Sequence, residues 1–219
     1  MSASKKSAAK VAVVDYGAGN LRSVAKALER SGLEVVVTGD PAVVRASDGV
    51  VLPGVGAFRD AVLQLRASGL EDAVKEAVET EKPYLGMCFG LQLLFEEGDE
   101  HGLTEGFGLL GGRVERFPDE DEAGEPLRVP QIGWNEVEWK GEHPMLEHLP
   151  ERDYYYFVHS YRPVPTDQSI VVGRTSYGGA FASAVATPKL FAVQFHPEKS
   201  QGSGKRLLDA YKAWVEAMR

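Results

Sequence analysis

The sequence has almost no cysteine and no long apolar run. Among its 219 residues only Cys88 is a cysteine, so no disulfide can form within the chain, and a single free thiol fits a reducing compartment. No stretch approaches the roughly 18 apolar residues of a membrane-spanning helix. Residues 1–10 are small, polar and basic, without the apolar core of a secretory signal. We therefore expect a cytoplasmic protein without membrane association, with a disordered tail at residues 1–10.

An excess of positive charge is also missing. The chain carries 24 Lys and Arg against 32 Asp and Glu, a formal charge of −8, whereas a nucleic-acid binder needs a basic face. No G-x-x-x-x-G-K-[ST] loop occurs, and Gly54 and Gly56 lack the third glycine of a dinucleotide site. His196 and Glu198 would supply two metal ligands where catalytic zinc uses three from the protein. We expect no nucleic acid, no metal and no cofactor.

The first half of the chain has the pattern of an α/β protein. Short β-rich runs alternate with amphipathic segments, which favours βαβ units and a mostly parallel sheet. Asn20 is expected to cap the first helix and Gly32 to end it. The expected strands are 11–15, 34–38, 49–52 and 84–87, and the expected helices are 21–31, two stretches up to residue 81 broken at 68–69, and 89–97.

After Gly111 the pattern changes to an antiparallel extension. The expected strands there are 113–117, 134–139, 154–159, 170–177 and 180–187, followed by the apolar run 191–195 and a final helix at 204–218. Residues 118–126 carry five acidic side chains and are interpreted as a solvated loop. Because no interdomain linker is visible, residues 11–219 are expected to form one domain.

Cys88 lies where an expected strand meets an expected helix, within the run Gly-Met-Cys-Phe-Gly at 86–90. A side chain at such a corner is exposed for attack, and glycines two residues before and after it remove a steric clash. Most lone cytosolic cysteines are inert buried thiols, but this context favours a nucleophile. A helix N-terminus contributes only about 0.3–1 kcal/mol, whereas activated cysteines lie roughly 1 to 5 pKa units below a free thiol. A histidine partner is therefore required.

His196 and Glu198 follow the last expected strand and can form a base with its orienting acid. Positions i and i+2 of an extended chain point to the same side, and Pro197 stiffens the link between them. A carboxylate on one ring nitrogen fixes the tautomer and leaves the other nitrogen to accept the thiol proton. Without the cysteine motif, a histidine at a strand end beside an incidental acid would be an equally good interpretation.

Two further features are candidates for handling a substrate. The loop Pro53–Gly56 ends an apolar strand, and its backbone N–H groups can face a developing negative oxygen. The expected oxyanion donors are the amide of Phe89 and one from the segment Gly54, Val55 and Gly56, with Val55 favoured. Gln92 lies one helical turn after Cys88 and so faces the same way, although an ordinary surface glutamine is the simpler explanation for it alone.

The runs around Cys88 and His196 together resemble the triad motifs of the class I glutamine amidotransferases. Residues 15–23, 53–58, 133–135, 156–161 and 194–200 further resemble one branch of that family, glutaminase subunits of histidine biosynthesis. The resemblance covers nearly all of residues 11–219. It departs at Gln131-Ile132, where relatives often carry histidine and methionine, and this leaves the details of a partner surface open.

The resemblance implies a flavodoxin-like fold and an enzyme that hydrolyses L-glutamine through Cys88, His196 and Glu198. It also implies that Gln92 and Glu100 hold the amino-acid end of the substrate, together with the backbone of His159, Ser160 and Tyr161. Because nothing in the chain could use ammonia, it implies a partner, a (β/α)₈-barrel cyclase in a heterodimer. Positions near that interface would be Asn20, Trp134 and Lys199.

Three alternatives remain at this stage. The chain could be a glutaminase of another pathway, such as pyridoxal phosphate synthesis, although residues 15–23 and 154–161 argue against it. It could be a cysteine hydrolase of peptides or γ-glutamyl compounds, which Gln92 and the missing secretory signal disfavour. It could also be an idle flavodoxin-like regulatory module, but such a protein has no reason to keep Cys88, His196 and Glu198 together.

Overall fold

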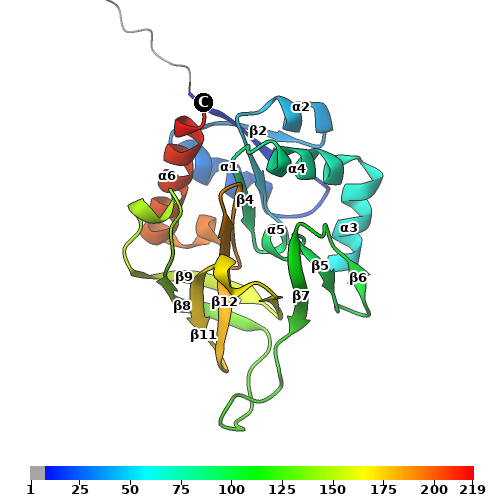
Figure 1. Cartoon of the computed structure of the whole chain (residues 1–219), viewed down its shortest axis with the longest axis vertical. Coiled ribbons are helices and arrows are strands. Elements are labelled where there is room, and N and C mark those ends of the chain that lie inside the picture. Colours follow the sequence, from blue (N-terminus) through cyan, green and yellow to red (C-terminus); the bar gives the residue numbers. More distant parts are fainter. Residues whose placement is uncertain (1–7) are drawn as a thin grey trace, which may run out of the picture.

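The computed structural model describes residues 8–219, in which strands and helices alternate up to residue 92 and strands then dominate (Figure 1). The first part contains β1 (Lys10–Val14), α1 (Leu21–Arg30), β2 (Glu34–Thr38), α2 (Pro41–Ala46), β3 (Gly49–Leu52), α3 (Phe58–Ala67), α4 (Leu70–Glu79), β4 (Tyr84–Met87) and α5 (Phe89–Gln92). The second part contains β5 (Phe95–Gly98), β6 (Thr104–Glu105), β7 (Leu110–Arg116), β8 (Gln131–Trp139), η1 (Leu146–His148), β9 (Arg152–His159), β10 (Tyr161–Pro165), η2 (Gln168–Ile170), β11 (Val171–Ser176), β12 (Ala180–Thr187), β13 (Leu190–Val193), η3 (Pro197–Lys199) and α6 (Gln201–Ala217).

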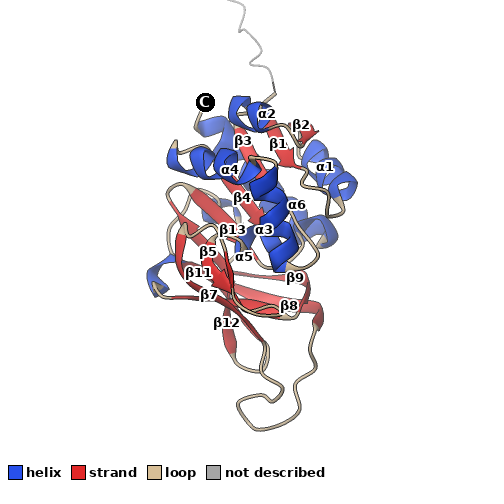
Figure 2. Ribbon diagram, turned by 90° about the vertical axis from the view of Figure 1, so that its right-hand side faces the viewer, coloured by secondary structure: helices blue, strands red, loops and turns tan. Residues whose placement is uncertain are grey.

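One sheet runs through these elements in the order β2-β1-β3-β4-β13-β12-β11-β8-β9. The pairings from β2 through β1, β3 and β4 to β13 are parallel, whereas the pairings from β13 through β12, β11 and β8 to β9 are antiparallel. A smaller sheet has the order β10-β7-β5-β6. Figure 2 shows the helices around the parallel part and the antiparallel strands extending below it. This arrangement confirms the predicted α/β class with its antiparallel extension.

The parallel strands are buried on both faces, which explains their continuous apolar sequences. Along β1, Val11 and Val13 face one core cluster, which also holds buried residues of α1 and α6. Ala12 and Val14 face a second cluster, formed with α2, α3 and α4. The period-2 alternation of one strand therefore divides its side chains between two helical layers.

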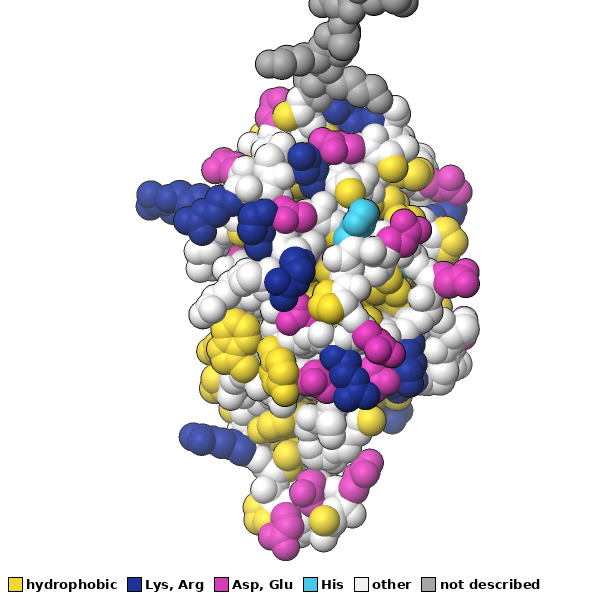
Figure 3. Space-filling view, turned by 90° about the vertical axis from the view of Figure 1, so that its left-hand side faces the viewer, with side chains coloured by type: hydrophobic (Ala, Val, Ile, Leu, Met, Phe, Trp, Pro, Cys, Tyr) yellow, Lys and Arg dark blue, Asp and Glu magenta, His cyan; other side chains and the backbone are white. Residues whose placement is uncertain are grey.

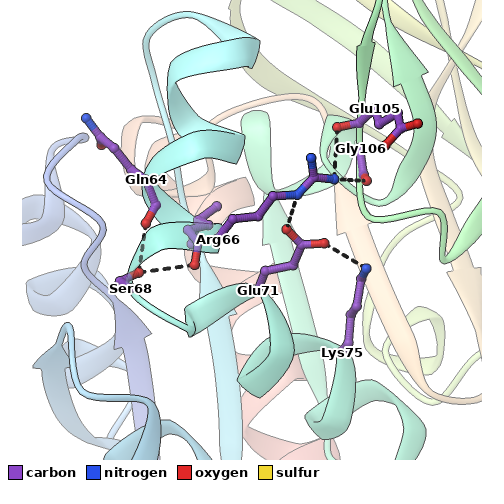
Figure 4. Close-up of polar contacts among 8 residues, drawn as sticks. Gln64, Arg66, Ser68, Glu71, Lys75, Glu105 and Gly106 are labelled. Atoms are coloured by element: carbon purple, nitrogen blue, oxygen red, sulfur yellow. Dashed lines mark hydrogen bonds and ion pairs between the residues drawn. The ribbon is translucent and has the colours of Figure 1, made fainter.

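Ion pairs to a buried carboxylate connect α3, α4 and the turn after β6 (Figure 4). The Glu71 carboxylate, whose side chain is 8% exposed, accepts from Arg66 Nε and Lys75 Nζ, both at 2.7 Å. Arg66 Nη2 also donates to the backbone oxygen of Gly106 at 3.2 Å. A carboxylate removed from water needs such partners, because leaving it unpaired is costly.

The predicted helix 89–97 is wrong in its second half. The helix α5 ends at Gln92, and β5 begins at Phe95. Backbone amides from far along the chain bind the carbonyls of this segment: Phe107 N donates to Leu93 O at 2.8 Å and Leu110 N to Leu94 O at 2.9 Å. Leu93, Leu94 and Phe95 are fully buried, so tertiary pairing overrides a helical pattern.

Other sequence predictions need smaller corrections. Asn20 occupies the N-cap position of α1, but its side chain makes no capping bond, whereas Gly32 ends that helix as predicted, with φ of 88°. Strand β7 pairs antiparallel with β10 but parallel with β5. Of the predicted N-terminal tail, residues 1–7 lie outside the described residues, Ala9 is buried, and Lys10 opens β1.

The acidic segment 118–126 is largely exposed, and Figure 3 shows acidic side chains gathered at the lower end of the molecule. Among residues 8–219, none of the helices combines the length and apolarity that crossing a membrane requires.

Candidate active site

Cys88 lies at the corner between β4 and α5, with φ of 54° and ψ of −103°. A non-glycine residue with positive φ is uncommon, and such strain concentrates at functional sites. The surrounding bonds hold the corner: Cys88 N donates to Val193 O at 2.8 Å, and Gln92 N donates to Cys88 O at 3.2 Å. The side chain is 3% exposed, so the thiol is reached only through a cavity.

The flanking glycines are required by close backbone contacts. A Cβ on Gly86 would lie 2.4 Å from Gly90 O, and a Cβ on Gly90 would lie 1.8 Å from Leu52 O. Either distance is far inside van der Waals contact. The sequence therefore needs glycine at 86 to let β4 approach the first turn of α5, and glycine at 90 to let α5 pack against β3.

The pairing of β4 with β13 brings the histidine to the cysteine. These strands are parallel, with Val193 opposite Met87, so the residues that follow them meet at the carboxyl ends of the strands, where open α/β sheets bind ligands. His196 Nδ1 lies 3.0 Å from Glu198 Oε1, and their side chains are 5% and 2% exposed. Nδ1–H donates to the carboxylate, which leaves Nε2 as the atom for proton transfer.

Charges around His196 favour its protonated form. Burial by itself lowers the pKa of His196, but the Cys88 sulfur and the Glu198 carboxylate raise it to about 10. Nε2 is buried and makes no hydrogen bond within the described residues, but the Cys88 sulfur lies near enough to raise the pKa of the ring. The arrangement suits a thiolate and an imidazolium side by side, as activated cysteines require.

A cavity of about 400 Å³ opens beside the thiol. It is lined by most of the residues predicted from the sequence, namely Val55, Gly56, Cys88, Phe89, Gln92, Glu100, His159, Ser160 and Tyr161, and also by Lys199. Pro130 and Val158 line it as well, and no sequence motif marks them. One oxygen of Glu100 accepts from Phe58 N at 2.6 Å, so this carboxylate also fixes the start of α3.

His159 contributes a neutral ring to the wall of this cavity. Burial lowers its pKa to about 4, and its Nδ1 lies 2.7 Å from Tyr161 O, to which Nδ1–H donates. The ring therefore holds the backbone turn at 159–161 in place without adding charge to the site.

The predicted oxyanion loop lies over Cys88. Gly54 packs so closely that an added Cβ would lie 2.2 Å from Tyr16 Oη and 2.7 Å from Phe89 Cβ. Burial and the Cys88 sulfur raise the pKa of Tyr16, and the backbone amide of Val55 lowers it. The Tyr16 hydroxyl is buried and makes no hydrogen bond within the described residues. Phe89 is the first residue of α5, so its amide has no acceptor within the helix.

Gln194 is a buried neighbour of the thiol that the sequence analysis missed. Its Nε2 donates to Cys88 Sγ at 3.6 Å, and its Oε1 accepts from Gln92 Nε2 at 3.0 Å. Glu198 lies in the 3-10 turn η3 and not in extended chain, so the predicted strand alternation does not explain its place beside His196. The available signal for Gln194 was its position directly after β13, two residues before His196.

The three residues predicted near a partner lie in two places. Asn20 and Lys199 are exposed and line a small cavity that His196 and Glu198 also line. Trp134 lies on the outward face of β8 and is 44% exposed. Its ring packs edge to face against that of Tyr156, with 6.1 Å between the ring centroids. At the departure from the family pattern, Gln131 is fully buried and Ile132 is 62% exposed.

Comparison with known proteins gives a consistent result. The family model described as glutamine amidotransferase class-I matches residues 12–211. Imidazole glycerol phosphate synthase subunit HisH of Methylococcus capsulatus is 50% identical over 209 residues, covering 93% of this chain and 96% of that relative. The protein of that name from Aromatoleum aromaticum is 49% identical over 210 residues, covering 94% and 98%. The solved structure of PurLQS from Thermotoga maritima has a TM-score of 0.74 at 19% identity, covering 95% of this chain and all of that one.

Proposed function

The chain belongs to the class-I glutamine amidotransferases, and we propose that it is the glutaminase subunit of imidazole glycerol phosphate synthase, in histidine biosynthesis. It hydrolyses L-glutamine to L-glutamate and ammonia. The observation that carries this proposal is the meeting of Cys88, His196 and Glu198 at the carboxyl ends of β4 and β13, in a chain about half identical to relatives of that name. The amidotransferase domain comprises residues 11–219, in keeping with the family match.

The proposed reaction has two stages at the Cys88 sulfur. The thiolate attacks the side-chain carbonyl carbon of glutamine, and the protonated His196 gives its proton to the leaving nitrogen as the C–N bond breaks. Ammonia departs, and a thioester remains on Cys88. Neutral His196 then takes a proton from water, whose oxygen attacks the thioester, and glutamate leaves. Glu198 holds the ring orientation throughout.

Recognition of glutamine is assigned to the cavity. Gln92 and Glu100 present oxygen atoms that suit an α-ammonium group, and the backbone of His159, Ser160 and Tyr161 meets the amino-acid end. The oxyanion is assigned to the amides of Phe89 and of the segment Gly54, Val55 and Gly56, with Val55 as the second donor. Because this loop has two glycines among four residues and can therefore rearrange at low cost, we propose that ligand binding by the partner turns the Val55 amide toward the substrate.

The ammonia is assigned to a cyclase partner, a (β/α)₈ barrel that receives it through its core. The partner forms imidazole glycerol phosphate and aminoimidazole carboxamide ribotide. Asn20 and Lys199 lie beside the triad, and Trp134 belongs to an apolar surface with Ile132 and Tyr154, each more than two-fifths exposed. Apolar side chains also gather on the lower half of the face in Figure 3. Such a patch is typical of a protein interface. We place this complex in the cytoplasm, where a lone thiol stays reduced.

The test is an assay of glutamate release with three preparations: the purified chain, the chain with the cyclase, and the complex with a cyclase ligand. We expect the rate to rise at each step, and glutamate release in none of them would contradict the proposed function. Equal, measurable rates in all three preparations would refute only the proposed rearrangement of Val55 and would leave the proposed activity standing. In the complex, Cys88→Ala is expected to abolish glutamine-dependent synthesis and to spare synthesis from added ammonia, which serves as the control for folding.

A further inference from the structure

A buried side-chain amide lies directly beside the nucleophile. Gln194 follows β13 as Cys88 follows β4, and the two strands are paired in register. Its side chain is fully buried, with Nε2 3.6 Å from Cys88 Sγ and Oε1 3.0 Å from Gln92 Nε2. Gln92 Nε2 also lies 3.0 Å from Tyr161 O. Two amides thus connect the sulfur to the backbone turn that lines the cavity.

The backbone carbonyl sets the direction of every hydrogen bond in this series. Tyr161 O can only accept, so Gln92 must present its NH₂ group there. The same NH₂ group then donates to Gln194, which must present its oxygen. Gln194 is left with its own NH₂ group on the side of Cys88, so the sulfur is held as an acceptor. Reversing Gln92 would place its oxygen against two acceptors, and reversing Gln194 would place two NH₂ groups against each other. Either arrangement is costly inside the protein.

The series also orients Gln92 for its own role. Both hydrogens of its NH₂ group are used by Tyr161 O and Gln194 Oε1. Its carbonyl oxygen is therefore the atom left to meet a ligand in the cavity that Gln92 lines. A glutamine fixed in this way accepts from a substrate ammonium group and cannot present a donor to it.

We infer that Gln194 is a positioning residue with two effects. It donates a hydrogen bond to the Cys88 sulfur, and it fixes the Gln92 amide with its oxygen toward the substrate. Its effect on the sulfur is independent of the substrate, whereas its effect on Gln92 rests on the proposed function. The donor matters because α5 has only four residues, so the helix dipole contributes little to a thiolate. A hydrogen bond to a charged acceptor is among the stronger ones in proteins.

The experiment compares the wild-type chain with Gln194→Met, which keeps the length of the side chain and removes both amide atoms. The readout is the rate of alkylation by iodoacetamide across pH, since a small reagent can reach the sulfur through the cavity. We expect the midpoint of the Gln194→Met profile to move up by about one to two pH units. In the complex, the KM for glutamine is expected to rise about tenfold as Gln92 loses its orientation, with ammonia-dependent synthesis unchanged.

Ser183→Ala is the matched control. Ser183 is fully buried on the neighbouring strand β12, its hydroxyl accepts from Thr175 at 2.9 Å, and its backbone oxygen, which remains, accepts from Gln194 N. Its alkylation midpoint is expected to match the wild type. If Gln194→Met does not fold, Gln194→Glu keeps the shape and replaces the donor by an acceptor, so the midpoint should move up further.

A midpoint within about 0.3 pH unit of the wild type in a folded Gln194 variant overturns the inference about the sulfur. An unchanged KM overturns the part that concerns Gln92. Alkylation requires neither glutamine nor the cyclase. If the wild-type complex released no glutamate, the proposed function would fail while the alkylation profiles still decided the role of Gln194.

Discussion

Replacing Gly90 by alanine would place a methyl group 1.8 Å from the carbonyl oxygen of Leu52. Both groups belong to backbone held by sheet and helix bonds, so neither can rotate away, and the corner at Cys88 must shift. Overpacking of this kind costs about 3 kcal/mol at the upper end of its usual range, and the lost glycine flexibility offsets about 0.4–1 kcal/mol of that. A net loss of about 2 kcal/mol corresponds to a fall in Tm of roughly 4–8 °C for a chain of this size.

Gly202→Ala is the matched control, because Gly202 is also a helical glycine without positive φ, and the nearest atom to its added Cβ is Arg206 Nη1 at 3.7 Å. That variant is expected to gain about 0.4–1 kcal/mol. We therefore expect scanning calorimetry to show a lower Tm for Gly90→Ala and a higher Tm for Gly202→Ala. Gly90→Ala should also lose glutaminase turnover, because the sulfur moves. A Gly90→Ala protein with unchanged Tm and full turnover would refute the steric account of the corner.

Three further predictions concern titratable side chains. Glu198→Gln should lower glutamine turnover by up to about 10⁴-fold through loss of the ring orientation and leave ammonia-dependent synthesis intact; turnover within tenfold of wild type would contradict it. Glu71→Gln should lower the free energy of unfolding by about 1–3 kcal/mol in urea titrations, because Arg66 and Lys75, which are partly exposed, lose their shared partner; no measurable change would show that the network is dispensable. The pKa of His159 is lowered to about 4 in the folded state against about 6.5 in the unfolded chain. The unfolded state therefore gains a proton between pH 7 and 5 that the folded state does not, and wild type should lose about 2 kcal/mol relative to His159→Gln over that range. Equal losses in the two proteins would contradict the buried neutral ring.

The sequence was most informative where local pattern and tertiary context agree. Strands 34–38, 49–52, 84–87 and 180–187 have the predicted boundaries, because each is an apolar run between clear turn residues. The steric need for Gly86 and Gly90 was also predictable, since it follows from the corner itself. Both features depend on neighbours in the chain, and such short-range constraints can be read without coordinates.

The failures involve partners distant in sequence. Residues 93–98 have a pattern compatible with a helix, and only the amides of 106–110 convert them to a strand. Gln194 belongs to the run 194–200 that resembles the family, but it received no role, because its role depends on Cys88 and Gln92, about a hundred positions earlier.

The nucleophile and its base lie on adjacent strands, β4 and β13, that are separated by about half of the chain. Contacts of such long sequence separation form late, because closing the intervening loop costs entropy before the pairing stabilises it. During synthesis, Cys88 leaves the ribosome long before His196 does. The growing polypeptide therefore carries an unpaired thiol in place of a working glutaminase, and ammonia production begins only when the final strand and helix have docked.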